Sequence, residues 1–124
     1  MKFDELDSRM RVFETASDHC VLPGIWIVAR LDGRSFTKLT RGIMRTSKGD
    51  LLQTPFDYYF KEIMVDTTEF LMRDSGVSVL YGYTQSDEIS LLFTLNEDSF
   101  GRKIRKLNSI LAGEASSYFS LKSN

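Results

Sequence analysis

The stretch YGYTQSDEISLLF, residues 81–93, decides the fold of this chain. Aromatic, aliphatic and β-branched residues lie on both sides of a short polar segment. This pattern predicts a β-hairpin, with strands at 77–83 and 89–95 joined by residues 84–88. Two adjacent acids, Asp87 and Glu88, would therefore lie where the second strand of the hairpin begins.

A further strand is predicted at 25–31, where an apolar run ends on Asp32-Gly33. Because the run is nearly continuous, it favours a central strand that is buried on both faces. Helices are predicted from three signals: helical spacing of apolar residues within 1–22, a Thr54-Pro55 start followed by helical periodicity to residue 73, and capping residues at 96–99.

The order strand, helix, strand, strand, helix is that of a split β-α-β unit without its last strand, an α/β (α+β) fold of the ferredoxin-like type. In this topology the first and third strands are antiparallel neighbours, and both helices cover one face. Asp32 would then meet Asp87 and Glu88. Uncompensated carboxylates repel one another, and such oxygen ligands hold Mg²⁺, so we expect a divalent-cation site here. Gly33 would let the backbone approach a ligand closely.

Composition bounds the class of protein. Hydrophobic content of 42%, charged content of 27% and a net charge of -1 indicate one globular domain. The single Cys20 favours a reducing compartment, and no apolar run could span a membrane, so we expect a cytoplasmic protein. His19-Cys20 falls short of the ligands that zinc needs and is interpreted as ordinary loop. Neither a P-loop nor a Ser-His-Asp arrangement occurs.

Basic residues gather at two places. Those at the start of the last helix form either a solvated face or a triphosphate clamp, because Arg102 and Lys106 would share a face at i, i+4 spacing near a helix N-terminus. The second group surrounds a predicted long loop at 40–53 and suits an RNA backbone; it consists of Arg34, Lys38, Arg41, Arg45 and Lys48.

The paired motifs Arg30-Leu31-Asp32-Gly33-Arg34-Ser35-Phe36 and Tyr81-Gly82-Tyr83-Thr84-Gln85-Ser86-Asp87-Glu88 resemble the tRNA-histidine guanylyltransferase family, especially its bacterial and archaeal 3′-to-5′ polymerases. The resemblance extends over 22–118 and includes Ala115-Ser116-Ser117-Tyr118. It implies a polymerase-type palm and a nucleotidyltransferase that adds nucleotides in the 3′-to-5′ direction to the 5′ end of tRNA, in guanylylation or repair. Mg²⁺, GTP or ATP, a tRNA partner and a homotetramer are implied as well.

Position by position, the resemblance implies that Asp32 and Asp87 ligate two Mg²⁺ ions together with the Gly33 carbonyl, while Glu88 matches the family's second acid and has a supporting catalytic role. Nucleotide contacts are implied for Asp32, Gly33, Arg34, Ser35, Phe36, Thr37, Ser86, Asp87, Arg102, Lys103 and Lys106. Family members carry a further C-terminal half with a His-Ile-Asn-Asn motif. Residues 1–124 are therefore expected to form a single palm-like catalytic domain, the N-terminal half of a longer protein or a truncated relative.

Two alternatives stay open. A palm-fold nucleotide cyclase would need a similar metal pair but no RNA. A non-catalytic module that binds nucleotide or RNA would fit the missing C-terminal half.

Overall fold

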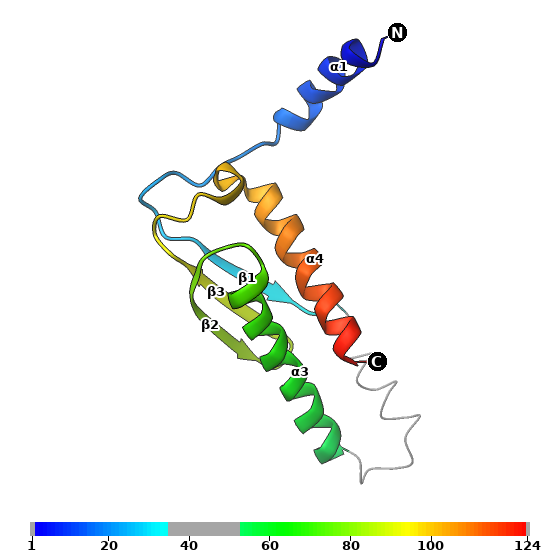
Figure 1. Ribbon diagram of the computed structural model, residues 1–124, viewed down its shortest axis with the longest axis vertical. Helices are drawn as coiled ribbons and strands as arrows, with labels where there is room; N and C mark the ends of the chain where they lie inside the picture. The colour runs from blue at the N-terminus through cyan, green and yellow to red at the C-terminus, as the bar shows by residue number, and fades with distance from the viewer. Residues whose placement is uncertain (1, 35–52, 124) are drawn as a thin grey trace.

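A three-stranded antiparallel sheet and two long helices form the body of the protein in the computed structural model, which describes residues 2–34 and 53–123. The fold is mixed α and β, as predicted. Figure 1 shows a further helix, α1, extending away from this body. The elements are α1 (Phe3–Thr15), β1 (Val28–Asp32), α3 (Gln53–Asp74), β2 (Val79–Gln85), β3 (Glu88–Phe93), the short 3₁₀ helix η2 (Ser99–Arg102) and α4 (Ile104–Ser123).

The strand order is β1-β3-β2, and both pairs are antiparallel. The predicted adjacency of the first and third strands is therefore confirmed. The Cα partner of Asp32 is Glu88, and the partner of Glu88 on the other side is Gln85. The hairpin is also confirmed, although β2 begins two residues later than predicted and its turn consists of Ser86 and Asp87 alone.

The prediction that the first strand is central and buried on both faces is wrong for the described sheet. β1 pairs only with β3 and lies at an edge. Its exposure alternates, so Ala29 and Leu31 are half-buried while the side chain of Val28 is 65% exposed. The physical reason is that α3 and α4 both cover the same face of the sheet, which leaves the alternate residues of β1 in solvent.

The core lies between this covered face and the two helices. On β3, every second residue is buried, namely Ile89, Leu91 and Phe93. Leu71 of α3 and Leu111 of α4 belong to the same cluster. Burial of each such side chain contributes about 1.5–3 kcal/mol, so this layer holds the strand ends against the helices.

α1 is confirmed as a helix, but none of its residues is buried. Its apolar residues, among them Phe3 and Phe13, are exposed to solvent. No helix within the described residues has the length and apolar character needed to cross a membrane.

The last helix begins later than predicted. Phe100, Gly101 and Arg102 all have left-handed backbone angles, with φ of 57°, 60° and 59°. Arg102 is the last residue of η2, and the extended backbone of Lys103 separates it from α4, which starts at Ile104. The helical i, i+4 relation expected between Arg102 and Lys106 therefore does not exist.

Candidate metal centre

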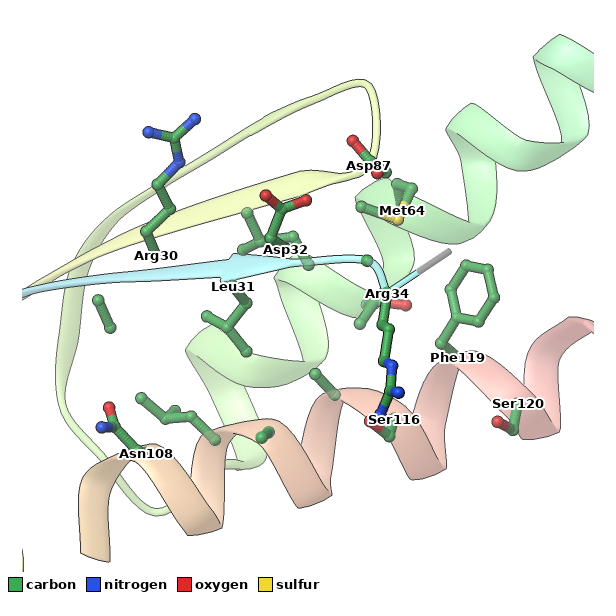
Figure 2. A pocket seen from close by; sticks show the side chains of 17 residues that line it. Arg30, Leu31, Asp32, Arg34, Met64, Asp87, Asn108, Ser116, Phe119 and Ser120 are labelled. Carbon is green, nitrogen blue, oxygen red and sulfur yellow. The ribbon is translucent and has the colours of Figure 1, made fainter. Parts of the chain in front are cut away.

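Three carboxylates meet where β1 ends and β3 begins. Asp32 is the last residue of β1, Glu88 is the first of β3, and Asp87 lies in the turn that joins β2 to β3. One oxygen from each of the three carboxylates lies within 4.8 Å of the other two. In Figure 2, Asp32 and Asp87 lie on the same side of β1, whereas Leu31 points the opposite way, toward α4. The structure thus brings together the three acids singled out in the sequence.

Hydrogen bonds to main-chain carbonyls fix this convergence. The Gly33 N–H donates to the Asp87 carbonyl oxygen over 3.0 Å, which ties the end of β1 to the hairpin turn. The Thr84 hydroxyl donates to the Glu88 carbonyl oxygen, also over 3.0 Å. Ser86 opens the turn with φ of 55°, a left-handed angle that a tight hairpin requires. The Gly33 N–H is therefore already used, and only its carbonyl remains to face a ligand.

Arg30 modifies the charge of this cluster. It lies two residues before Asp32 on the same face of β1, and its guanidinium forms an ion pair with Glu88. The hydrogen bond to Glu88, followed by the charge of that carboxylate, raises the pKa of Arg30 above its ordinary value. Within the described residues, the carboxylates of Asp32 and Asp87 have no hydrogen bond or ion pair, although the charge of Asp32 also acts on Arg30. Glu88 is thus the acid already engaged, while the other two are available to an added cation.

A cavity of about 660 Å³ opens beside the carboxylates on the helix-covered side of β1. Figure 2 shows Arg34 reaching from the end of β1 toward Ser116 on α4. Within the described residues, the Arg34 side chain has no hydrogen bond or ion pair. The cavity wall is mainly apolar, with a few polar groups from α4; its members include Leu31, Met64, Asn108, Ala115, Ser116, Phe119 and Ser120.

The basic residues predicted to form a triphosphate clamp do not reach this cavity. Arg102 is 7% exposed, and its guanidinium donates hydrogen bonds to main-chain carbonyls. One acceptor is the Ile25 carbonyl, which lies before the start of β1, whereas Asp32 lies at the end of that strand. The Lys103 ammonium lies 3.2 Å from the Asp18 carboxylate. Lys106 is exposed on α4 and does not line the cavity.

The other basic side chains near the start of α4 form ion pairs with acids of the N-terminal segment, chiefly Asp18. Arg105 forms ion pairs of 2.9 Å with both Asp18 and Glu14. Loss of solvent would raise the pKa of Asp18, but hydrogen bonds from Lys103 and Arg105 outweigh that effect and hold it below its usual value. The basic run therefore connects α4 to the N-terminal segment, a role that the local charge pattern did not indicate.

The remaining predicted nucleotide contacts are Ser86, which the structure describes, and three residues that it does not. Ser86 lies exposed in the turn beside Asp87, and its role as a nucleotide contact stays a prediction. Ser35, Phe36 and Thr37 lie outside the described residues, as does most of the predicted RNA-binding group, namely Lys38, Arg41, Arg45 and Lys48.

No site role was predicted from the sequence for Arg30 or for the polar residues that α4 presents to the cavity. Asn108, Ser116 and Ser120 are spaced by multiples of four, as residues on one helix face are. That spacing was the signal in the sequence that could have shown these polar residues to share one face of α4. The partner of Arg30 depends on strand pairing, which local spacing does not encode.

The sequence profile of the tRNAHis guanylyltransferase family matches residues 7–124. The chain belongs to this family. A probable tRNA(His) guanylyltransferase of Drosophila melanogaster is 33% identical over 90 residues, which is 73% of this chain and 29% of the fly protein. The tRNA(His) guanylyltransferase of Neurospora crassa is 31% identical over 100 residues, 80% of this chain and 31% of the fungal protein.

A viral protein extends the comparison. Protein R259 of Acanthamoeba polyphaga mimivirus is 30% identical over 121 residues, 98% of this chain and 38% of the viral protein. The chain thus spans about a third of the length of the curated relatives it matches. The predicted family resemblance is confirmed.

Proposed function

We propose that this chain is the metal- and nucleotide-binding part of a nucleotidyltransferase that adds nucleotides, in the 3′-to-5′ direction, to the 5′ end of tRNA. One observation carries the proposal: in a chain of this family, one carboxylate oxygen from the end of β1 and two from the β2–β3 turn and the start of β3 lie within 4.8 Å of one another. A stable fold has no need of such a repulsive cluster, whereas divalent cations would neutralise it.

The donor set suits Mg²⁺. Carboxylate and carbonyl oxygens are the ligands that this cation takes in proteins, and Asp32, Asp87 and the Gly33 carbonyl provide them. We assign two ions to this site and a supporting role to Glu88, because Arg30 already occupies its carboxylate. Bound Mg²⁺ would neutralise the triphosphate and lower the pKa of the attacking hydroxyl.

The chain's own residues would bind and orient the nucleotide. The cavity of about 660 Å³ lies within the size range of small-molecule sites and adjoins Asp32 and Asp87. Arg34 extends into it and would contact a phosphate, since guanidinium groups pair with phosphate oxygens. Ser116 and Asn108 would hydrogen-bond the sugar or base, while the apolar wall would exclude water. The described positions do not favour Arg102 or Lys103 as phosphate ligands.

The wider parts of the proposal follow from the family. We assign GTP or ATP as nucleotide substrates, tRNA as the acceptor, a cytoplasmic location and a homo-oligomeric state, with residues 1–124 acting as one palm-like catalytic unit. The strand order β1-β3-β2 supports a palm of split β-α-β form.

The direct test is Mg²⁺-dependent GTP binding by calorimetry on Asp32→Asn and Asp87→Asn variants. We expect each to weaken Mg·GTP binding at least about tenfold, because each removes one anionic ligand from the metals. Asp98→Asn is the matched control, since Asp98 is an exposed acid next to η2 and outside the cavity lining. Unchanged Mg·GTP affinity in both site variants would refute the metal site.

Incubation with a tRNA lacking its 5′ nucleotide, Mg²⁺ and labelled GTP distinguishes the transferase from the two alternatives, the cyclase and the non-catalytic module. Incorporation of label into the tRNA supports the transferase. Formation of a cyclic nucleotide without RNA labelling would replace it by the cyclase. Nucleotide or tRNA binding with neither product would favour the non-catalytic module.

A further inference from the structure

We infer that the open face of the sheet is the surface on which the single-stranded end of the RNA acceptor lies, with Tyr83 and Tyr81 as stacking platforms. This inference rests on the proposed function and assigns a place to its larger substrate. The open face is defined here as the side opposite α3 and α4; it consists of Val28, Arg30, Asp32, Tyr81, Tyr83, Gln85, Glu88, Ser90 and Leu92.

Strand register arranges these residues in three rows. The first row joins Asp32, Glu88 and Gln85 across the sheet. Because alternate residues share a face, Tyr83 lies one row from the carboxylates and Tyr81 two rows, at steps of roughly 6.8 Å along β2. The two rings therefore form a track that leads to the candidate metal centre.

Both rings are available to a ligand. Tyr81 is 61% exposed and Tyr83 is 50% exposed. Neither ring contacts another aromatic ring within the described residues, and the Tyr83 hydroxyl donates to the Gln85 side-chain oxygen over 3.1 Å. Tyrosine rings that stand free on a sheet face provide flat platforms for unpaired bases, as in other sheet-based RNA-binding domains.

The chemistry of the middle row adds a phosphate contact. Arg30, Ser90 and Tyr83 lie in register across the three strands. The Arg30 guanidinium is anchored by Glu88 yet stays largely exposed, so its remaining N–H groups can donate to a backbone phosphate. A cation beside aromatic rings and hydrogen-bonding side chains is typical of single-stranded RNA sites, whereas the core of a protein interface is depleted of charge.

The opposite side of the sheet cannot take this substrate. The cavity there is bounded by β1, α3 and α4, and its volume of about 660 Å³ suits a mononucleotide rather than a polynucleotide. Asp32 lies on the open face and also lines the cavity. The carboxylates therefore stand where the two faces meet, with the nucleotide approaching from the cavity and the RNA end from the open face.

The test measures binding of a fluorescent single-stranded RNA, with the sequence of a tRNA acceptor end, to the full chain by anisotropy. We expect the double variant Tyr81→Ala/Tyr83→Ala to lose about tenfold or more in RNA affinity, because each stacked base contributes substantially. Tyr81→Phe/Tyr83→Phe should stay within about twofold, since the rings remain. Tyr58→Ala is the matched control, a tyrosine on α3 that is 68% exposed and off the sheet.

Two further readouts distinguish the outcomes. Mg·GTP affinity should be the same in the alanine double variant and the wild type, and ultraviolet crosslinking of thiouridine-substituted RNA to the wild type should label Tyr81 or Tyr83. Unchanged RNA affinity in the double variant, an equal loss in Tyr58→Ala, or a change in oligomeric state without an RNA effect would overturn the inference. Failure of Mg·GTP binding in the wild type would instead refute the proposed function, and calorimetry would detect that failure independently of the RNA measurement.

Discussion

Replacement of Arg102 by alanine should destabilise the fold without weakening nucleotide binding. The guanidinium donates to four main-chain carbonyls, those of Val21, Ile25, Leu95 and Glu97. These acceptors belong to two separate loops, one leading into β1 and one leading into η2. Arg102 thus fastens the start of β1 to the connection between β3 and α4.

The magnitude follows from those contacts. A hydrogen bond from a charged donor contributes about 1.5–3 kcal/mol, and the bonds to Val21 (3.1 Å) and Glu97 (2.6 Å) have good distances, whereas that to Leu95 (3.4 Å) adds little. Because the loops lie near solvent, water would replace part of the loss. We expect Arg102→Ala to lower the free energy of unfolding by about 3–5 kcal/mol and the melting temperature by about 10–20 °C.

Urea unfolding followed by circular dichroism would measure this loss. Arg102→Lys should recover only part of the stability, because one ammonium cannot reach four carbonyls that fan around a planar group. Lys106→Ala is the control, an exposed residue with an expected change below about 0.5 kcal/mol. The reasoning is wrong if Arg102→Ala keeps wild-type stability but binds Mg·GTP more weakly, which is the result that the triphosphate clamp requires.

Three other perturbations give distinct readouts. Burial alone would raise the pKa of Glu97, but hydrogen bonds from Ser99 and Ser78 bring it below the ordinary 4.5. The stability that the Glu97 carboxylate contributes should therefore be lost as pH falls below about 4.5. Urea unfolding at a series of pH values should show the difference in free energy of unfolding between wild type and Glu97→Gln closing there. Gly82→Ala should cost about 1–3 kcal/mol in thermal unfolding, because its Cβ would lie 2.6 Å from the Met72 sulfur, and a smaller residue at 72 should restore part of it. In EDTA, Asp32→Asn should raise the melting temperature slightly, since two carboxylates within 4.8 Å repel by about 1 kcal/mol in water. Added Mg²⁺ should raise the melting temperature of the wild type and not that of the variant. An equal rise in both proteins would contradict the metal site.

The parts of the fold that the sequence predicted correctly are those with local signals. The hairpin at 81–93 alternates and turns within a few residues, and the Thr54-Pro55 pair lies within one residue of the observed start of α3. Pairing of β1 with β3 followed from element order alone, because connections between successive elements allow few arrangements. These two facts were sufficient to place Asp32 beside the hairpin acids.

The errors concern properties that depend on distant partners. An apolar run such as 25–31 reports hydrophobicity but not how many layers cover a strand, so the edge position of β1 was missed. The same topology that put both helices on one face should have excluded two-sided burial. The i, i+4 relation between Arg102 and Lys106 was wrong because Arg102 ends η2, ahead of α4. Its acceptors at Val21 and Ile25 lie far away in sequence, so local spacing could not reveal them.

Because Asp32 pairs with Glu88 across the sheet, this site depends on the number of residues in β1 as well as on the presence of the acids. One residue inserted into β1 ahead of Asp32 would turn its carboxylate toward α4, although every acid would still be present in the sequence. When homologues are surveyed for activity, the number of residues between the apolar run of β1 and the acid should therefore be the same as in this chain. That spacing is a better criterion for an intact metal site than the presence of the acids alone.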